Sequence, residues 1–145
     1  MSFLVDERDG KGLGDDSDAI TKKIFKIDLN GATDVSQIAS LDASSPVVSK
    51  TLFLDLVTAL NTAGISAANV PAKIEALAFG PDMEINGVTK HTLYIANDND
   101  FLPNLTDTLH PNGVANPNQF YVFAIDTADL PNYDAQDLAV NPRKN

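Results

Sequence analysis

The chain of 145 residues contains no cysteine, so disulfides, thiolate catalysis and thiolate metal sites are excluded. Basic residues are also scarce, because 10 Lys and Arg stand against 20 Asp and Glu, which gives a formal net charge of −10. This balance argues against a nucleic-acid backbone or an anionic membrane surface as a partner. It is compatible with cation binding, although a soluble acidic surface is the commoner cause of such a balance.

The sequence also lacks the motifs of several common protein classes. No run approaches the roughly 20 apolar residues of a membrane-spanning helix, and residues 1–8 do not have the pattern of a signal peptide. His91 and His110 stand alone, without a His-x-x-x-His pair, which argues against a zinc hydrolase. There is no Gly-x-Ser-x-Gly elbow and no evident Ser-His-Asp set, so a serine esterase has no support.

What the sequence does contain is apolar alternation, which predicts an all-β protein with antiparallel sheets. Hydrophobic residues make up 43% and charged residues 21%, as in an ordinary globular domain. A short helix is expected near 56–63, where Leu56 and Leu60 have helical spacing and Gly64 follows at a stop position. Strands are expected over residues 2–6, 21–29, 47–56, 74–79, 92–96 and 119–126.

The last of these strands is apolar on both faces, which predicts that it is buried between two layers, with its aromatic residues in the core. Turns are predicted at Gly80-Pro81-Asp82 and at Asn86-Gly87. The stretch 102–118 has no periodic pattern and is expected to be a long loop. Residues 131–145 are expected to form a poorly ordered tail, so the domain is predicted over 1–130.

One arrangement occurs twice: a strand, then a cluster of acidic residues, then a strand ending in Ile-Asp. The first copy runs from Phe3–Gly10 to Ile24–Asp28, and the second from Leu93–Asp100 to Phe120–Asp126. Such a repeat of supersecondary units is typical of propeller blades.

Two stretches carry candidate site residues near the middle of the chain. Asn97-Asp98-Asn99-Asp100 follows a strand and offers the oxygen ligands that calcium prefers; the alternative is turn chemistry, with side chains capping backbone amides. Glu75 shares one side of a period-2 strand with Leu77 and Phe79, which predicts a partly buried carboxylate. Such a group is a metal ligand, a general base or a salt-bridge partner, with Lys73, Lys50 or Arg8 as the nearby bases.

A third group ends the first strand and consists of Glu7, Arg8 and Asp9. Arg8 is the best phosphate-binding candidate, because a guanidinium binds phosphate oxygens bidentately. An intramolecular ion pair within this group is the alternative.

Five further segments are informative when they are taken in order along the chain: Phe3–Gly10, Lys23–Val35, Lys50–Leu56, Lys73–Pro81 and Tyr94–Phe101. In combination they resemble the C-terminal part of the phytase-like proteins, the family named for "esterase-like activity of phytase". The resemblance extends to about Asp126.

The resemblance implies a partial β-propeller of about two blades. In it, 74–126 supplies three strands of one blade and 1–56 supplies outer strands of the preceding blade. A part-propeller has no closed ring and has open strand edges, which favour pairing with other chains. The chain is therefore expected to self-associate through these edges or to be a fragment of a longer protein.

The resemblance also implies metal-assisted hydrolysis of phosphoesters, with a phosphorylated small molecule as substrate, Ca²⁺ as cofactor and a secreted or periplasmic location. The alternatives are a non-catalytic secreted propeller module for binding or scaffolding, and a truncated inactive fragment. The residues implied are Glu75 and Asp98 for catalysis, Arg8 and Lys73 for the substrate, and Glu7, Asp9, Asn97, Asp98 and Asp100 for the metal.

Overall fold

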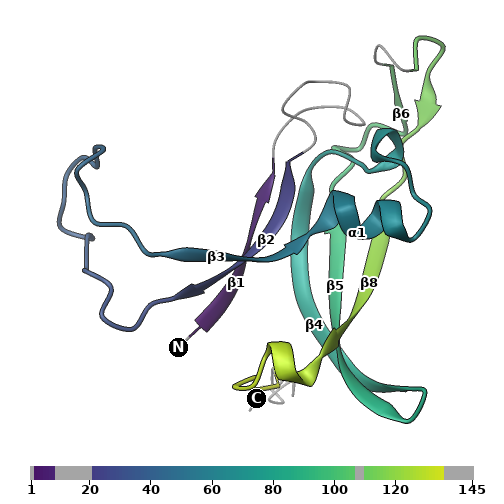
Figure 1. The fold of residues 1–145 in the computed structure, drawn as a ribbon. Helices are drawn as coiled ribbons and strands as arrows, with labels where there is room; N and C mark the ends of the chain where they lie inside the picture. The colour runs from purple at the N-terminus through teal and green to yellow at the C-terminus, as the bar shows by residue number, and fades with distance from the viewer. Residues whose placement is uncertain (1, 9–20, 107–109, 136–145) are drawn as a thin grey trace, which may run out of the picture.

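The computed structural model describes residues 2–8, 21–106 and 110–135, and it confirms an all-β fold with one short α-helix (Figure 1). Among the described residues, no helix is long and apolar enough to cross a membrane. The elements are β1 (Ser2–Arg8), β2 (Lys22–Asp28), β3 (Lys50–Asp55), α1 (Leu56–Thr62), the 3-10 turn η1 (Ala67–Asn69), β4 (Ile74–Ile85), β5 (Val88–Asn97), β6 (Asn104–Leu105), β7 (Val114–Ala115), β8 (Phe120–Asp126) and the 3-10 turn η2 (Thr127–Asp129).

The strands form two antiparallel three-stranded sheets, β1-β2-β3 and β4-β5-β8, and a short β6-β7 pair. This confirms that residues 74–126 supply the strands of one sheet and residues 1–56 those of another. Neither three-stranded sheet closes on itself within the described part of the chain. The number of propeller blades is not confirmed, and a complete ring stays a prediction.

The hairpin between β4 and β5 is built partly as the sequence predicts. Asn86 and Gly87 have φ values of +53° and +77°, the left-handed pair that a two-residue hairpin turn requires. The predicted turn at Gly80-Pro81-Asp82 is wrong, because β4 continues to Ile85. A register shift between Gly80 and Met83 instead forms a bulge, where proline is tolerated because the ladder is interrupted.

Helix α1 begins where the sequence predicts, and its ends are capped. The Oδ1 of Asp55 accepts a hydrogen bond from the N–H of Thr58 at 2.9 Å, which satisfies one of the free donors of the first turn. At the other end, Gly64 has a φ of +90° and donates its N–H to the carbonyl of Asn61 at 3.0 Å. The helix buries Leu56 and Leu60.

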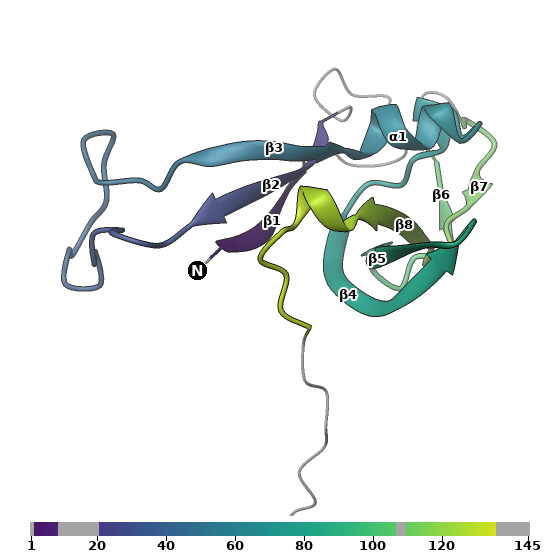
Figure 2. The same cartoon turned by 60° about the horizontal axis from the view of Figure 1, so that its bottom comes forward.

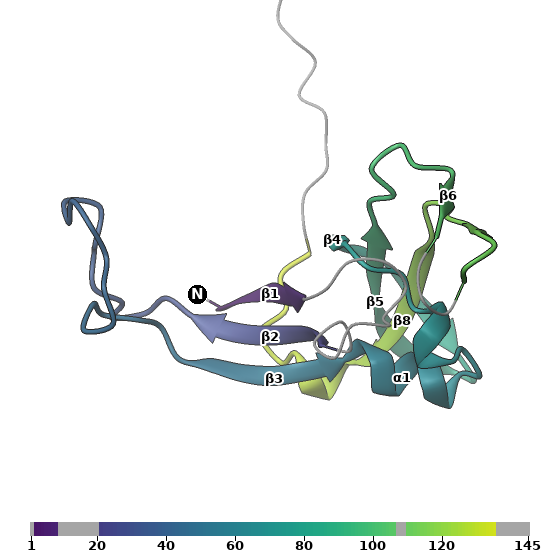
Figure 3. The same ribbon diagram turned by 90° about the horizontal axis from the view of Figure 1, so that it is seen from above.

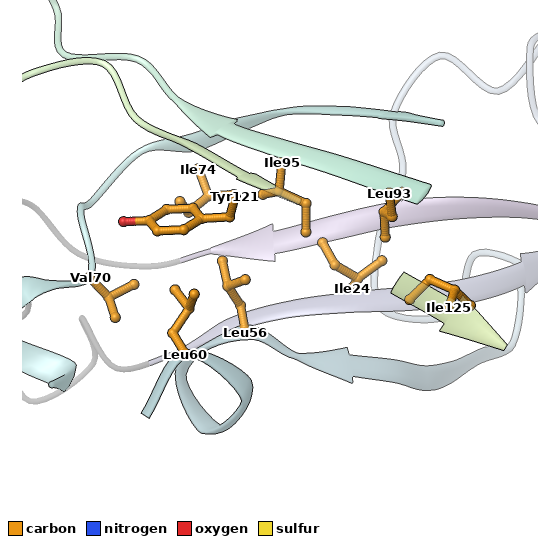
Figure 4. Packing of buried hydrophobic residues seen from close by; sticks show 9 residues of the cluster. All are labelled: Ile24, Leu56, Leu60, Val70, Ile74, Leu93, Ile95, Tyr121 and Ile125. Carbon is orange, nitrogen blue, oxygen red and sulfur yellow. The ribbon is translucent and has the colours of Figure 1, made fainter. Parts of the chain in front are cut away.

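The hydrophobic core lies between the two sheets and α1 (Figure 4). Leu93 and Ile95 of β5 pack toward Ile24 of β2, and Leu56 and Leu60 close the cluster from the helix. The remaining buried members are Val70, Ile74, Tyr121 and Ile125.

Strand β8 is covered on one face only. Tyr121 and Ile125 are buried in the core, whereas Phe120 and Val122 on the opposite face are 73% and 51% exposed. The prediction that this strand is buried between two layers, with Phe120 in the core, is therefore wrong for the described structure. Its sequence has the pattern of a doubly covered strand, but only one layer is in place.

A long connection between β2 and β3, residues 29–49, projects away from both sheets in all three views and is called the arm below (Figures 1, 2 and 3). The arm contains no helix or strand. It is organised by Asx turns, in which Asp34 accepts from the N–H of Ser36 at 2.9 Å and Asp42 from that of Ser44 at 2.8 Å.

The tail predicted over 131–145 is described only as far as residue 135. Within this part, Tyr133 packs its ring against Phe79 and His91, with centroid distances of 4.8 and 4.1 Å. The backbone N–H of Tyr133 also donates to the carbonyl of Leu130 at 2.9 Å.

Candidate functional site

The candidate site is assembled where β4 begins and β5 ends. The ladder pairs Ile74 with Asn97, and the next residue out, Asp98, donates its N–H to the carbonyl of Lys73 at 2.9 Å. Lys73 has a φ of +54°, a conformation that a non-glycine residue adopts rarely. These contacts hold the loop after β5 against the segment before β4.

Four of the residues predicted for function come together here: Lys73, Glu75, Asp98 and Asp100, called the acidic cluster below. The ammonium of Lys73 forms an ion pair with the carboxylate of Asp100. The hydrogen bond within this ion pair is the main cause that raises the pKa of Lys73 above its usual value. Desolvation opposes the rise, whereas the negative charges of Asp100, Glu75 and Asp98 add to it. The cluster therefore combines three carboxylates with one ammonium.

Glu75 is exposed, so the prediction of a partly buried carboxylate is wrong. The register shifts between Ile74 and Ala76, and this bulge breaks the period-2 alternation on which the prediction rested. Ile74 thus points into the core, at 1% exposure, while Glu75 stands on the surface of the cluster.

Asn97 is buried and its side chain contacts the protein's own backbone. Its Oδ1 accepts a hydrogen bond from the N–H of Gln119 at 2.7 Å, and its Nδ2 donates to the carbonyl of Pro117 at 3.4 Å. The side chain thereby extends the pairing of β5 and β8 beyond the last residue of the ladder. It was predicted as a metal ligand, but the contact it makes here is structural.

The next residues show the turn chemistry that was the alternative to metal binding. Asp98 Oδ1 accepts from the N–H of Asp100 at 2.8 Å, and Asn99 Oδ1 accepts from that of Phe101 at 3.1 Å. Asp100 and Phe101 have φ values of +52° and +58°, so these side chains support a tight left-handed turn. The buried Asn116 locks the same loop by donating to the carbonyls of Asn99 and Leu102.

Among the described residues, the predicted calcium ligands do not form a preorganised binding site. Within residues 2–8, 21–106 and 110–135, no group of three or more Asp, Glu or His side chains is placed to hold a metal ion. Glu7 and Arg8 lie opposite Lys23 and Lys22 in the β1–β2 register, and Asp9 lies outside the described residues. β1 contacts β4, and the end of β1 lies at the same end of the sheets as the start of β4 (Figure 1).

A cleft of about 440 Å³ lies beside this loop rather than over the acidic cluster. Its lining includes Ile65, Asn69, Val114, Asn116 and Gln119, and none of the residues that line it is ionisable. The cleft therefore offers amide groups and apolar surface, and its lining has no charged side chain to pair with a phosphate.

Sequence reasoning missed the pairing of His91 with Asp82. His91 was taken as isolated, but its Nδ1 lies 2.8 Å from Oδ1 of Asp82, and its ring is buried under Tyr133. The bulge after Gly80 places Asp82 opposite His91. The signal that could have revealed it is Pro81, because a proline inside a long strand indicates a bulge.

The comparisons with known proteins agree with the resemblance in the sequence. The phytase-like family model, described as "esterase-like activity of phytase", matches residues 1–101, which include β1 to β5 and the whole acidic cluster. The family match ends at residue 101, whereas the resemblance in the sequence was expected to extend to about Asp126. No curated protein and no solved structure matches the chain. Since the family model covers more than half of the sequence, the chain belongs to the phytase-like family.

Proposed function

We propose that the chain is a phytase-like phosphoester hydrolase domain and that the acidic cluster is its reaction site. The observation that carries the proposal is the position of Lys73 between three carboxylates, inside the region matched by the family. Residues whose pKa is perturbed by specific charge partners occur frequently at functional sites, and they also occur in structural ion-pair networks.

In this proposal the ammonium of Lys73 contacts a phosphate oxygen, after exchanging its ion pair with Asp100 for the substrate. Glu75 and Asp98 are exposed, so water reaches both carboxylates. One of them orients that water and accepts its proton during attack on phosphorus. Arg8, the last residue of β1, is proposed as a second residue that contacts the phosphate.

Charge supports the further proposal of calcium. Three carboxylates and one ammonium leave an excess of negative charge, and a phosphate group would add to it. A divalent cation bound by Asp98, Asp100 and substrate oxygens would offset this repulsion and polarise the phosphoryl group. Glu7, Asp9 and Asn97 remain predicted ligands.

A non-catalytic role is the second candidate, and the turn contacts favour it. Asp98 and Asn99 use side-chain oxygens to cap backbone amides, and the described cleft is lined without ionisable residues. In that case the acids stabilise the loop, and the domain serves as a binding or scaffold module.

Phosphate release from phytate and from an aryl phosphate tests the proposal, with and without added Ca²⁺. Whichever of Glu75→Gln and Asp98→Asn removes the general base should lower kcat/KM by roughly 100-fold or more, since a general base contributes about that much. Asp129→Asn, an exposed acid in η2, is the matched control and should retain wild-type activity. Equal background rates for the wild type, Glu75→Gln and Asp98→Asn would favour the non-catalytic role.

A further inference from the structure

The loop between β5 and β6 exposes an aromatic side chain in an unfavourable backbone conformation. Phe101 is 96% exposed, the highest value for a large apolar side chain among the described residues. Its φ of +58° lies in the left-handed region, which a bulky side chain adopts rarely and at a cost in free energy. Burial does not offset this cost, because so little of the ring is removed from water. The stability of the fold therefore does not explain a phenylalanine at this position.

Hydrogen bonds around Phe101 hold the loop in this conformation. Asn99 Oδ1 accepts from the N–H of Phe101 at 3.1 Å, and the carbonyl of Asn99 accepts from the N–H of Leu102 at 2.8 Å. The buried side chain of Asn116 also donates to the carbonyls of Asn99 and Leu102, at 3.3 and 2.9 Å. The backbone that carries the ring is thus ordered before any ligand binds, which lowers the entropic cost of a contact with it.

Phe101 stands next to the acidic cluster. It follows Asp100, whose carboxylate pairs with Lys73, and Asp98 belongs to the same loop. Leu102, the residue after it, is 50% exposed. Residues 98–102 thus carry carboxylates and exposed apolar side chains together, with an ammonium beside them. Apolar surface with a small number of polar or charged groups is the usual lining of sites for organic ligands.

We propose that Phe101 contacts the organic group of the substrate and that this group is aromatic, so that the domain acts on aryl phosphoesters. The inference rests on the proposed hydrolase function, because that proposal assigns the phosphate to Lys73. An ester held there by its phosphate has its organic group beside the loop, and Phe101 is the largest exposed apolar residue of that loop. Two aromatic rings in contact attract each other beyond the effect of the area that they bury.

The chemistry of the phenyl ring also indicates which substrates are disfavoured. The ring has no polar group, so a hydroxylated organic group would lose hydrogen bonds to water on contact with it and gain none. Leu102 offers no polar side-chain group either. We therefore expect the domain to bind an aryl phosphate more tightly than glycerol phosphate. In this proposal Phe101 determines specificity and takes no part in the attack on phosphorus.

Replacement of Phe101 by Asn tests whether the ring serves binding or the fold. Asn adopts left-handed backbone conformations more readily than Phe, so Phe101→Asn should have a free energy of unfolding equal to or above that of the wild type. Urea denaturation measures this quantity. A clear loss of stability in Phe101→Asn would show that the ring supports the fold, and it would overturn the proposal.

Binding of two non-hydrolysable phosphonates tests the contact without relying on turnover. Phenylphosphonate and methylphosphonate share the phosphonate group and differ in the aromatic ring. The wild type should bind phenylphosphonate more tightly, and Phe101→Asn should weaken that binding by about tenfold while the affinity for methylphosphonate stays unchanged. Phe101→Tyr keeps a ring and should retain the preference, and Val47→Asn, at a 90% exposed position of the arm, is the control and should bind like the wild type. Isothermal titration calorimetry with and without Ca²⁺ measures these affinities.

Hydrolysis of an aryl phosphate and of glycerol phosphate separates the two proposals. Phe101→Asn should raise KM for the aryl ester by about tenfold with little change in kcat, and should leave both constants for glycerol phosphate unchanged. If the wild type binds neither phosphonate and hydrolyses neither ester, the hydrolase function fails and the role of Phe101 fails with it. If the wild type hydrolyses both esters but Phe101→Asn affects them equally or not at all, the hydrolase function stands and the role of Phe101 is refuted. Self-association that disappears with Phe101→Asn, at unchanged phosphonate affinity, would refute that role too and assign the ring to a contact between chains.

Discussion

The carbonyl oxygen of Lys73 accepts a hydrogen bond from the backbone N–H of Asp98 at 2.9 Å, just beyond the last pair of the β4–β5 ladder. Beside this bond, the ammonium of Lys73 forms an ion pair with Asp100, two residues further along the loop. The acidic cluster therefore depends on backbone geometry at the sheet end as well as on the acids themselves.

Replacing Asp100 with Asn should lower the pKa of Lys73, because the hydrogen bond to Asp100 is the main cause of its rise. In the wild type this pKa is raised in the folded state, so the ion pair contributes stability below the unfolded value of 10.5. That contribution is lost as the pH rises through the folded-state pKa. Titration of the lysine side chains by NMR measures the shift.

Asp126→Asn is the matched control for that titration, because Asp126 pairs with Lys90 at the other end of the strands. It should leave the pKa of Lys73 unchanged. An equal shift in both variants would show that the overall charge of the chain, rather than the contact with Asp100, sets the pKa.

Asn97→Ala should lower the free energy of unfolding by about 1–3 kcal/mol, the penalty for leaving a buried polar group without its partner. The substitution leaves the N–H of Gln119 unpaired, because in the wild type this N–H donates a hydrogen bond to Asn97 Oδ1 at 2.7 Å. Urea denaturation measures the loss. Asn61→Ala, at an exposed position of α1, should change stability far less.

The sequence was sufficient to predict elements whose signals are local. The helical spacing of Leu56 and Leu60 and the stop at Gly64 predict α1, and Asn86-Gly87 predicts the hairpin, because each signal depends on residues a few positions apart. The grouping of strands into two sheets was also predicted correctly, through the family resemblance. Four residues of the candidate site, Lys73, Glu75, Asp98 and Asp100, were selected in advance and do lie together.

The sequence could not reveal the bulges, and these account for the errors at the site. A bulge changes which side of the sheet a residue faces without leaving a periodic signal, so Glu75 was placed on the buried side and Asp82 in a turn. Phe120 was assigned to the core for a different reason. Its strand has the composition of a doubly covered strand, and composition does not say whether the second layer belongs to the same chain.

Two aspartates of the arm should titrate below the ordinary value of 3.8. The Ser44 side chain and N–H hydrogen-bond Asp42, and the N–H of Ser36 bonds Asp34; these bonds favour the ionised carboxylates and lower both pKa values. Since the folded-state pKa is depressed, the turns are stabilised above pH 3.8 and lose that support as the pH falls through the folded value.

NMR titration of the aspartate carboxyl carbons measures these values directly. Ser44→Ala should raise the pKa of Asp42, because the hydroxyl is its strongest hydrogen-bond donor, and should leave the pKa of Asp34 unchanged. If Asp42 does not respond, the arm does not hold this turn in solution.

Gly80→Ala should destabilise the protein by about 1–3 kcal/mol through overpacking, although its φ is not in the left-handed region. The added methyl would lie 2.3 Å from Cε2 of Tyr94 and 2.8 Å from Oγ1 of Thr92, so the tyrosine ring must shift. In a Tyr94→Ala background the same change should cost less, because the nearer of the two obstacles is gone. A double-mutant cycle of urea unfolding measures this coupling, and additive effects would contradict the close contact between ring and glycine.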